Sequence, residues 1–96
     1  MSDLDPRLVQ LLAELSVDSP YPDKEPEEVQ NDWMERMECE SIVAGLVSSA
    51  IHGGRVNGGH LAEARALLDS HSSWSHRWPS HYNRLSETCK ALSNYL

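Results

Sequence analysis

The sequence predicts an all-α protein, a compact bundle of about four helices with one long central helix. Apolar residues recur at spacings of three and four in several segments, which is the period of a helix with one buried face. No segment shows the period-two alternation with β-branched residues that marks a strand. The 96 residues match the size of one domain, so we expect a single helical domain over residues 1–96.

The first predicted helix begins with Asp5 as its cap and Pro6 at its first position, where a missing N–H is no loss. Its apolar stripe contains Leu4, Leu8, Leu11 and Leu15. We expect this helix to end near Ser16, because Pro20 and Pro22 interrupt the segment that follows.

The second predicted helix is the long one and runs from about Pro26 to His52. One of its faces is apolar except at Glu40 and consists of Val29, Trp33, Met37, Glu40, Ala44, Val47 and Ile51. Its second half is apolar nearly all round, so we expect that half to be central and buried. Gly45 indicates a close helix crossing there, and Gly53-Gly54 supplies the stop.

Two shorter helices complete the predicted bundle. The third runs from about His60 to about Ser70 on an apolar stripe of Leu61, Ala64, Leu67 and Leu68. The last helix starts at Pro79 and has the most regular stripe in the chain, formed by Trp78, Tyr82, Leu85, Cys89, Leu92 and Leu96. We interpret residues 71–77, between these helices, as a connector.

Composition indicates a cytoplasmic protein without membrane contact. No apolar run approaches the roughly 20 residues that a membrane span needs, and the mean hydropathy is −0.51. The N-terminus lacks the basic start and apolar stretch of a signal peptide. Cys39 and Cys89 lie in predicted helices without CxxC spacing, so we expect reduced, half-buried thiols.

A histidine-rich stretch is the strongest candidate for a metal site. His71, His76 and His81 are five residues apart, and five residues turn a helix by about 500°, so neighbours would point about 140° apart. Zinc ligands on a helix favour spacings of three or four. We therefore predict no metal and no cofactor. A loop that folds these histidines around a metal, with Cys39 or Cys89 as a further ligand, leaves a small metal-binding regulator open as an alternative.

No catalytic site is predicted either. The serines lack the Gly-x-Ser-x-Gly pattern of a nucleophile elbow. Cys89 lies in the apolar stripe of the last helix, so we interpret it as a core residue rather than a nucleophile. The glycine-rich loop 53–59 lacks the Gly-Lys-Ser/Thr of a phosphate-binding loop and is interpreted as a helix connector. We therefore predict a non-enzymatic protein.

The charge of the chain is acidic and uneven. The net charge is −7, and residues 1–40 contain twelve acidic residues against three basic ones. Such a balance opposes direct binding to nucleic acid, which needs clustered lysine and arginine. Glu28, Asp32 and Glu35 share one side of the long helix, near Glu25, and form a predicted acidic contact surface.

The second predicted contact region contains Trp74 and Arg77, residue types that are enriched in interface hot spots. We expect Trp33 and Trp78 to be mainly structural, because a chain without phenylalanine needs them in its core. Trp74 lies outside the helical stripes and is predicted to be exposed for contact.

These observations predict a small acidic protein that binds another macromolecule. The predicted partner is a protein with a basic surface, which can be a surface that normally binds nucleic acid. The predicted partner-binding residues are Glu25, Glu28, Asp32, Glu35, Trp74 and Arg77. Inhibitors from phages and other mobile elements, including immunity and anti-CRISPR proteins, often share this size and charge, so we expect inhibition by occlusion. A structural subunit that forms a helical homodimer stays open as a second alternative.

Overall fold

A computed structural model describes residues 21–96 together with Pro6, Val9, Gln10 and Ala13. Residues 21–96 form four α-helices, which are α2 (Glu27–Gly53), α3 (Gly58–Ser70), α4 (Trp74–Arg77) and α5 (Pro79–Leu92), and a final 3-10 turn, η1 (Ser93–Tyr95). The described part of the chain contains no strand, so the all-α prediction is confirmed. The predicted first helix lies outside the described residues except for the four named above, which are helical.

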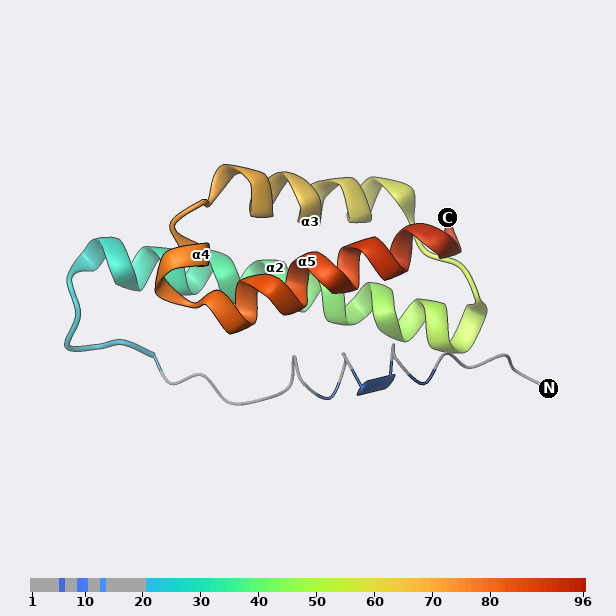
Figure 1. The fold of residues 1–96 in the computed structure, drawn as a ribbon, viewed down its shortest axis with the longest axis horizontal. Helices are drawn as coiled ribbons and strands as arrows, with labels where there is room; N and C mark the ends of the chain where they lie inside the picture. Colours follow the sequence, from blue (N-terminus) through green and yellow to red (C-terminus); the bar gives the residue numbers. More distant parts are fainter. Residues whose placement is uncertain (1–5, 7–8, 11–12, 14–20) are drawn as a thin grey trace.

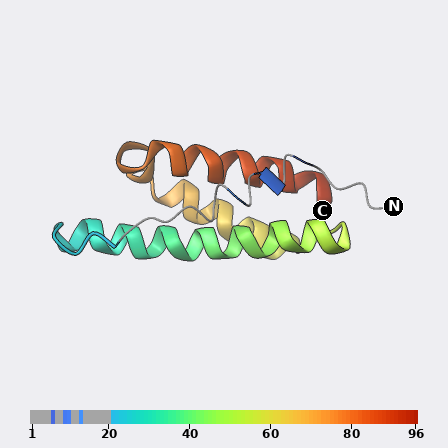
Figure 2. The same ribbon diagram turned by 90° about the horizontal axis from the view of Figure 1, so that it is seen from below.

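Helices α2, α3 and α5 pack against one another in all three pairings, and α4 packs against α5. Figures 1 and 2 show α2 as the longest helix, with α3 and α5 lying along it. With 27 residues, α2 is about 40 Å long. Its N-terminal turns extend beyond the end of α3, close to α4 (Figure 1). The chain segments before α2 and around α4 therefore meet at this end of the molecule.

Residues with strong local preferences determine where the helices begin and end. Gly54 ends α2 in the left-handed conformation with a φ of 71°, and its N–H donates to the carbonyl oxygen of Ala50. The side chain of Asn57 caps α3 by accepting hydrogen bonds from the backbone N–H groups of Gly59 and His60. Pro79 begins α5, as the sequence predicted.

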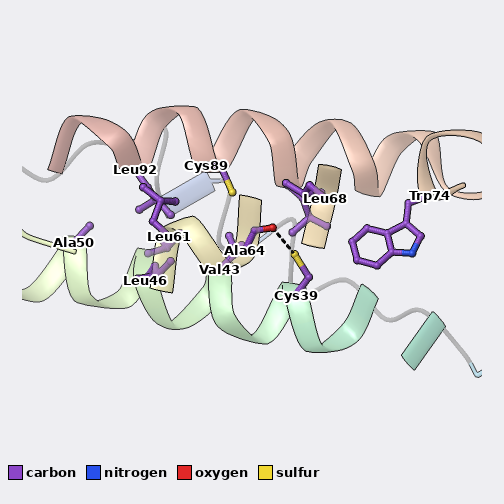
Figure 3. Close-up of a cluster of buried hydrophobic side chains, with 12 residues drawn as sticks. Cys39, Val43, Leu46, Ala50, Leu61, Ala64, Leu68, Trp74, Cys89 and Leu92 are labelled. Atoms are coloured by element: carbon purple, nitrogen blue, oxygen red, sulfur yellow. Dashed lines mark hydrogen bonds between the residues drawn. The ribbon is translucent and has the colours of Figure 1, made fainter. Parts of the chain in front are cut away.

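The core contains apolar residues from α2, α3, α4 and α5 (Figure 3). They are Cys39, Val43, Leu46, Val47, Ala50, Leu61, Ala64, Leu68, Trp74, Leu85, Cys89 and Leu92. This confirms that the second half of α2 is buried and that Cys89 is a core residue. Both cysteines are free thiols, and that of Cys39 donates to the carbonyl oxygen of Ala64 over 3.6 Å.

Two predictions about local packing were wrong. Gly45 does not mark a close helix crossing, because nothing lies within 4 Å of the position that a Cβ would occupy there. Residues 71–77 are not only a connector, since they contain the single-turn helix α4. A helix of one turn is too short to show an apolar period, so the sequence carried no signal for it. Among the described helices, none combines the length and the apolar composition needed to cross a membrane.

Candidate partner-binding site

The structure brings the two predicted contact regions together, and they bind each other. Asp32, on α2, accepts hydrogen bonds from Arg77 Nη1 over 2.5 Å and from Ser73 Oγ over 2.6 Å. Arg77 Nη2 also lies 3.6 Å from a carboxylate oxygen of Glu28. Part of the acidic side of α2 therefore serves to hold α4 in place rather than to face solvent.

His71 provides a second link between α2 and the segment that precedes α4. Its Nε2 is paired with the carboxylate of Glu35, and its Nδ1 lies 2.7 Å from the carbonyl oxygen of Leu67. Its ring stacks on Trp74, with the ring centroids 4.5 Å apart and the planes 14° apart. Glu35, predicted as a contact residue, is thus half exposed but already carries an internal partner.

Trp74 is not the exposed contact residue that the sequence predicted. It is 0% exposed and lies at one end of the apolar core (Figure 3). The physical reason is the turn before α4: the N–H of Trp74 donates to the carbonyl oxygen of His71, and the single turn of helix that follows directs the indole inward. The prediction that Trp74 is exposed was therefore wrong.

The two tryptophans that the sequence assigned to the core are half-buried and line a surface cleft, and Trp78 also packs against the core. The cleft has a volume of about 350 Å³ and lies between the segment before α2, the first turns of α2 and the junction of α4 and α5. Its lining residues are Pro22, Glu25, Val29, Trp33, Arg77 and Trp78. We call it the tryptophan cleft. Of the predicted contact residues, Glu25 and Arg77 line it.

Neighbouring side chains hold the walls of the tryptophan cleft. Tyr21 contacts the ring of Trp33 edge to face, with the centroids 5.1 Å apart and an angle of 83°. The guanidinium of Arg36 lies over Trp78, 4.6 Å from the ring centroid. Each indole is therefore held by a neighbouring side chain, and we expect both to move little on binding.

Gln30 makes the hydrogen bonds that attach the wall formed by residues 21–25 to α2. Gln30 accepts a hydrogen bond from the hydroxyl of Tyr21 over 3.1 Å. Its amide nitrogen donates to the carbonyl oxygens of Asp23 and Glu25, over 3.2 and 3.0 Å. One side chain thus fixes three points of an irregular segment, which places Pro22 and Glu25 at the cleft.

A buried charged cluster lies next to the cleft, below Trp78. Glu40 accepts from Arg36 Nη1 and from His81 Nδ1, each over 3.2 Å, and so links α2 to α5. Arg36 is 0% exposed, and burial lowers the pKa of its guanidinium, while the negative charge of Glu40 acts in the opposite direction. Arg36 and Glu40 are four residues apart on α2, and the structure shows that both side chains are buried.

The exposed charge around the cleft is acidic. Glu25 and Glu27 are exposed, and the side chain of Glu28 is 83% exposed. Arg77, the cation in the lining, is offset by Asp32 and Glu28. The rim of the tryptophan cleft therefore presents net negative charge to solvent.

A second groove runs between α2 and α3, with a volume of about 500 Å³. Gly45 lies at its surface, which explains why this glycine has open space beside it. Its other lining residues are mostly polar: Glu38, Ser41, Ile42, Leu46, Ser49, Asn57, His60 and Glu63. The Asn57 oxygen is occupied in capping α3, so the groove offers only scattered exposed groups.

The described residues include all five histidines, and they contain no group of three or more His, Cys, Asp or Glu side chains placed to hold a metal ion. His71 and His81 are engaged with different carboxylates, Glu35 and Glu40. His76 is exposed. The geometry in this part of the chain thus gives no support to the metal-binding alternative.

Comparison with known proteins adds no further constraint. No protein-family model, curated protein or solved structure matches the chain. The tryptophan cleft and its acidic rim are therefore interpreted from their own geometry and chemistry.

The sequence found part of this site and missed its apolar lining. It singled out Glu25 and Arg77, but it did not single out Pro22, Val29 or Trp33 as contact residues. A signal for two of them was present, because Val29 and Trp33 are four residues apart and so share one face of α2. Nothing in the local pattern showed that this face continues beyond the core.

Proposed function

We propose that this protein is a non-enzymatic binding protein that occludes a basic surface of another protein. The observation that supports this proposal is the tryptophan cleft near the first turns of α2 (Figure 1), which has two indoles in its lining and the carboxylates of Glu25 and Glu28 in or beside it. Interfaces are commonly organised in this way, with a small apolar centre inside a polar rim.

The charge distribution supports a basic protein as the partner. Residues 1–40 contain nine more acidic than basic residues; of these acidic residues, Glu25 lines the cleft and Glu28 lies beside Arg77 at its edge. Complementary charge speeds association and selects against acidic partners. The same charge repels the phosphate backbone of nucleic acid, so we propose contact with a protein, including one whose basic surface normally receives nucleic acid.

Occlusion is the proposed mode of action. The acidic end covers a basic surface of the partner and prevents its normal ligand from binding there. This is the behaviour expected from the size and charge that the chain shares with phage and mobile-element inhibitors. It requires no cofactor and no chemical step.

The structure changes which residues test this proposal. Asp32 and Glu35 are bonded internally, so reversing their charge would disturb the position of α4 and of His71 as well as the surface. Glu25 and Glu27 are exposed carboxylates at the cleft end of α2 and are the better choice. Glu63 and Asp69 are exposed on α3, away from the cleft, and provide a control with the same change in charge.

The experiment compares Glu25→Lys/Glu27→Lys with Glu63→Lys/Asp69→Lys in affinity capture from the native cell, quantified by mass spectrometry. We expect the first variant to lose at least about tenfold of a captured protein that the control variant retains, because opposite charges at the interface become like charges. Circular dichroism checks that both variants are folded. Retention of every captured protein by the Glu25/Glu27 variant, or equal losses in both variants, would contradict the proposal.

A further inference from the structure

The shape of the tryptophan cleft specifies the kind of partner segment that it binds. We infer that the cleft takes one large apolar side chain, such as phenylalanine, from a partner segment in which this residue is flanked by lysine or arginine. This inference rests on the proposed function and adds to it the chemistry of the contacted segment.

The size and lining of the cleft support the binding of a large apolar side chain. Its lining combines the apolar side chains of Trp33, Trp78, Val29 and Pro22 with two charged side chains, those of Glu25 and Arg77. The volume of about 350 Å³ is at the lower end of the usual range of ligand pockets, about 300–1,000 Å³. A cavity of this size has room for one large side chain.

Bracing of the walls makes the cleft suitable as an anchor site. Tyr21 contacts Trp33, Arg36 lies over Trp78, and Gln30 ties residues 21–25 to α2. A preformed cleft loses little conformational freedom when it is filled, so more of the burial energy of the anchor side chain appears as affinity.

The charges at the rim support a preference for lysine or arginine beside the inserted side chain. Glu25 lines the cleft, and Glu28 lies within reach of Arg77 at its edge. Asp32 already balances Arg77 from inside, which leaves the exposed carboxylates in excess. Residues on either side of an inserted anchor would meet these carboxylates, so lysine or arginine at those positions is favoured and glutamate or aspartate is opposed.

The same charges disfavour insertion of α2 from a second copy of this chain. The exposed large apolar residues of α2 are Met34 and Met37, and each is next to an acidic residue, Glu35 or Glu38. A copy that inserted either methionine would bring like charges to the rim. The basic segment of a different protein avoids this repulsion.

The test uses synthetic peptides with a defined sequence. The probe is Gly-Lys-Lys-Phe-Lys-Lys-Gly, compared with one peptide that has alanine in place of phenylalanine and another that has glutamate in place of each lysine. Binding to the full chain is followed by the indole N–H signals of Trp33 and Trp78 in ¹H–¹⁵N NMR spectra, with the buried Trp74 as internal reference. We expect the probe to shift both cleft signals and to bind at least about tenfold more tightly than either control peptide.

Two variants locate the binding. Val29→Gln places a polar group in the cleft and is expected to weaken probe binding at least about fivefold. Met34→Gln changes an exposed residue of the same helix that does not line the cleft, and it is expected to leave the affinity unchanged.

Each other outcome overturns the inference. Equal binding of the phenylalanine and alanine peptides would show that the cleft does not take a large apolar side chain. Equal binding of the lysine and glutamate peptides would show that basic flanking residues are not preferred. An absence of shifts with any peptide would contradict both parts of the inference. Signals that shift when the protein alone is diluted identify a second copy as the occupant. The two experiments also separate this inference from the proposed function. If the peptides bind without selectivity but capture from the cell still depends on Glu25 and Glu27, the proposed function stands and this inference fails. If the peptides bind selectively but capture does not depend on these residues, the cleft specificity stands and the proposed function fails.

Discussion

At the scale of single residues, Glu40 is the carboxylate that links the buried charged cluster. It accepts from Arg36 and from His81 in a part of the molecule where all three side chains are mostly removed from water. A buried pair of this kind adds little net stability, because the attraction is offset by the loss of hydration of both ions. Removal of one partner is costly, since the other charge then remains buried without its counter-ion.

Substitution of Glu40 tests this account of the cluster. We expect Glu40→Leu to lower the free energy of unfolding by about 3 kcal/mol, because the guanidinium of Arg36 loses its carboxylate. The double variant Arg36→Met/Glu40→Leu should recover most of that loss. Urea unfolding at pH 7 measures both values. A double variant less stable than the single one would contradict the expectation.

Burial also disfavours the charged form of the two core thiols, Cys39 and Cys89. Burial raises the pKa of Cys39 from 9.0 to about 12, with smaller contributions from Cys89, Glu40 and Glu38. Burial also raises the pKa of Cys89 to about 11, against an opposing effect of Arg65. The thiolate is the nucleophilic form, so both cysteines are inert as nucleophiles at neutral pH.

Alkaline destabilisation follows from these pKa values. As the pH rises above 9, the thiols of the unfolded chain lose protons before those of the folded chain, so the free energy of unfolding falls up to about pH 11 for Cys89 and about pH 12 for Cys39. The loss is up to about 1.4 kcal/mol per pH unit for each thiol.

Single variants isolate this contribution from that of the other titrating groups. We expect the loss of stability between pH 8 and pH 10, measured by urea unfolding, to be smaller by about 1 kcal/mol in Cys39→Ala and in Cys89→Ala than in the unchanged protein. The same loss in all three proteins would show that the thiols do not contribute.

At the scale of helices, α4 depends on contacts with α2 for its position. A single turn is not stable alone, because helix nucleation fixes several residues for few hydrogen bonds. Asp32 compensates by accepting from the Ser73 side chain just before α4 and from Arg77 at its end. Trp74, between them, fills the core. The small helix is therefore held by polar contacts at both ends and by one buried aromatic residue in the middle.

Substitution of Asp32 tests this dependence. We expect Asp32→Ala to lower the free energy of unfolding by about 2 kcal/mol, because it removes two hydrogen bonds, one of them charged, from a partly buried site. Hydrogen exchange of the backbone amides in α4 should become faster, while that in the middle of α2 and α5 changes less. Asp69→Ala, on the exposed side of α3, is the control and should change neither quantity. Unchanged exchange in α4 would show that Trp74 alone positions it.

At the scale of the whole molecule, the acidic end of α2 and the junction of α4 and α5 form one surface from chain segments more than 40 residues apart. Residues 22–33 supply one side of the tryptophan cleft, and Arg77 and Trp78 supply the other. Neither segment contains the cleft by itself. The tryptophan cleft therefore exists only in the folded protein, and we expect loss of the contact between α2 and α4 to open it.

The helical architecture was largely predictable from the sequence, and the contact site only in part. The stop at Gly54 and the start at Pro79 were read correctly because each depends on a residue with a strong local preference. The burial of Trp74 was not predictable, because burial depends on what packs beside a side chain. Trp74 had no visible period but is buried, whereas Trp33 and Trp78 follow helical stripes and reach a cleft.

The sequence by itself determined that the protein is helical, where its long helix ends, and that its acidic residues lie mainly in the first 40 positions. These properties follow from residue type and from periods of three and four, which act over short distances along the chain. Only the tertiary structure decided which acidic residues are free to meet a partner. Asp32 and Glu35 pair with Arg77 and His71, residues distant in sequence, while Glu25 and Glu27 remain exposed beside the tryptophan cleft. The reason is that pairing and burial depend on packing between helices, which no local pattern in the chain specifies.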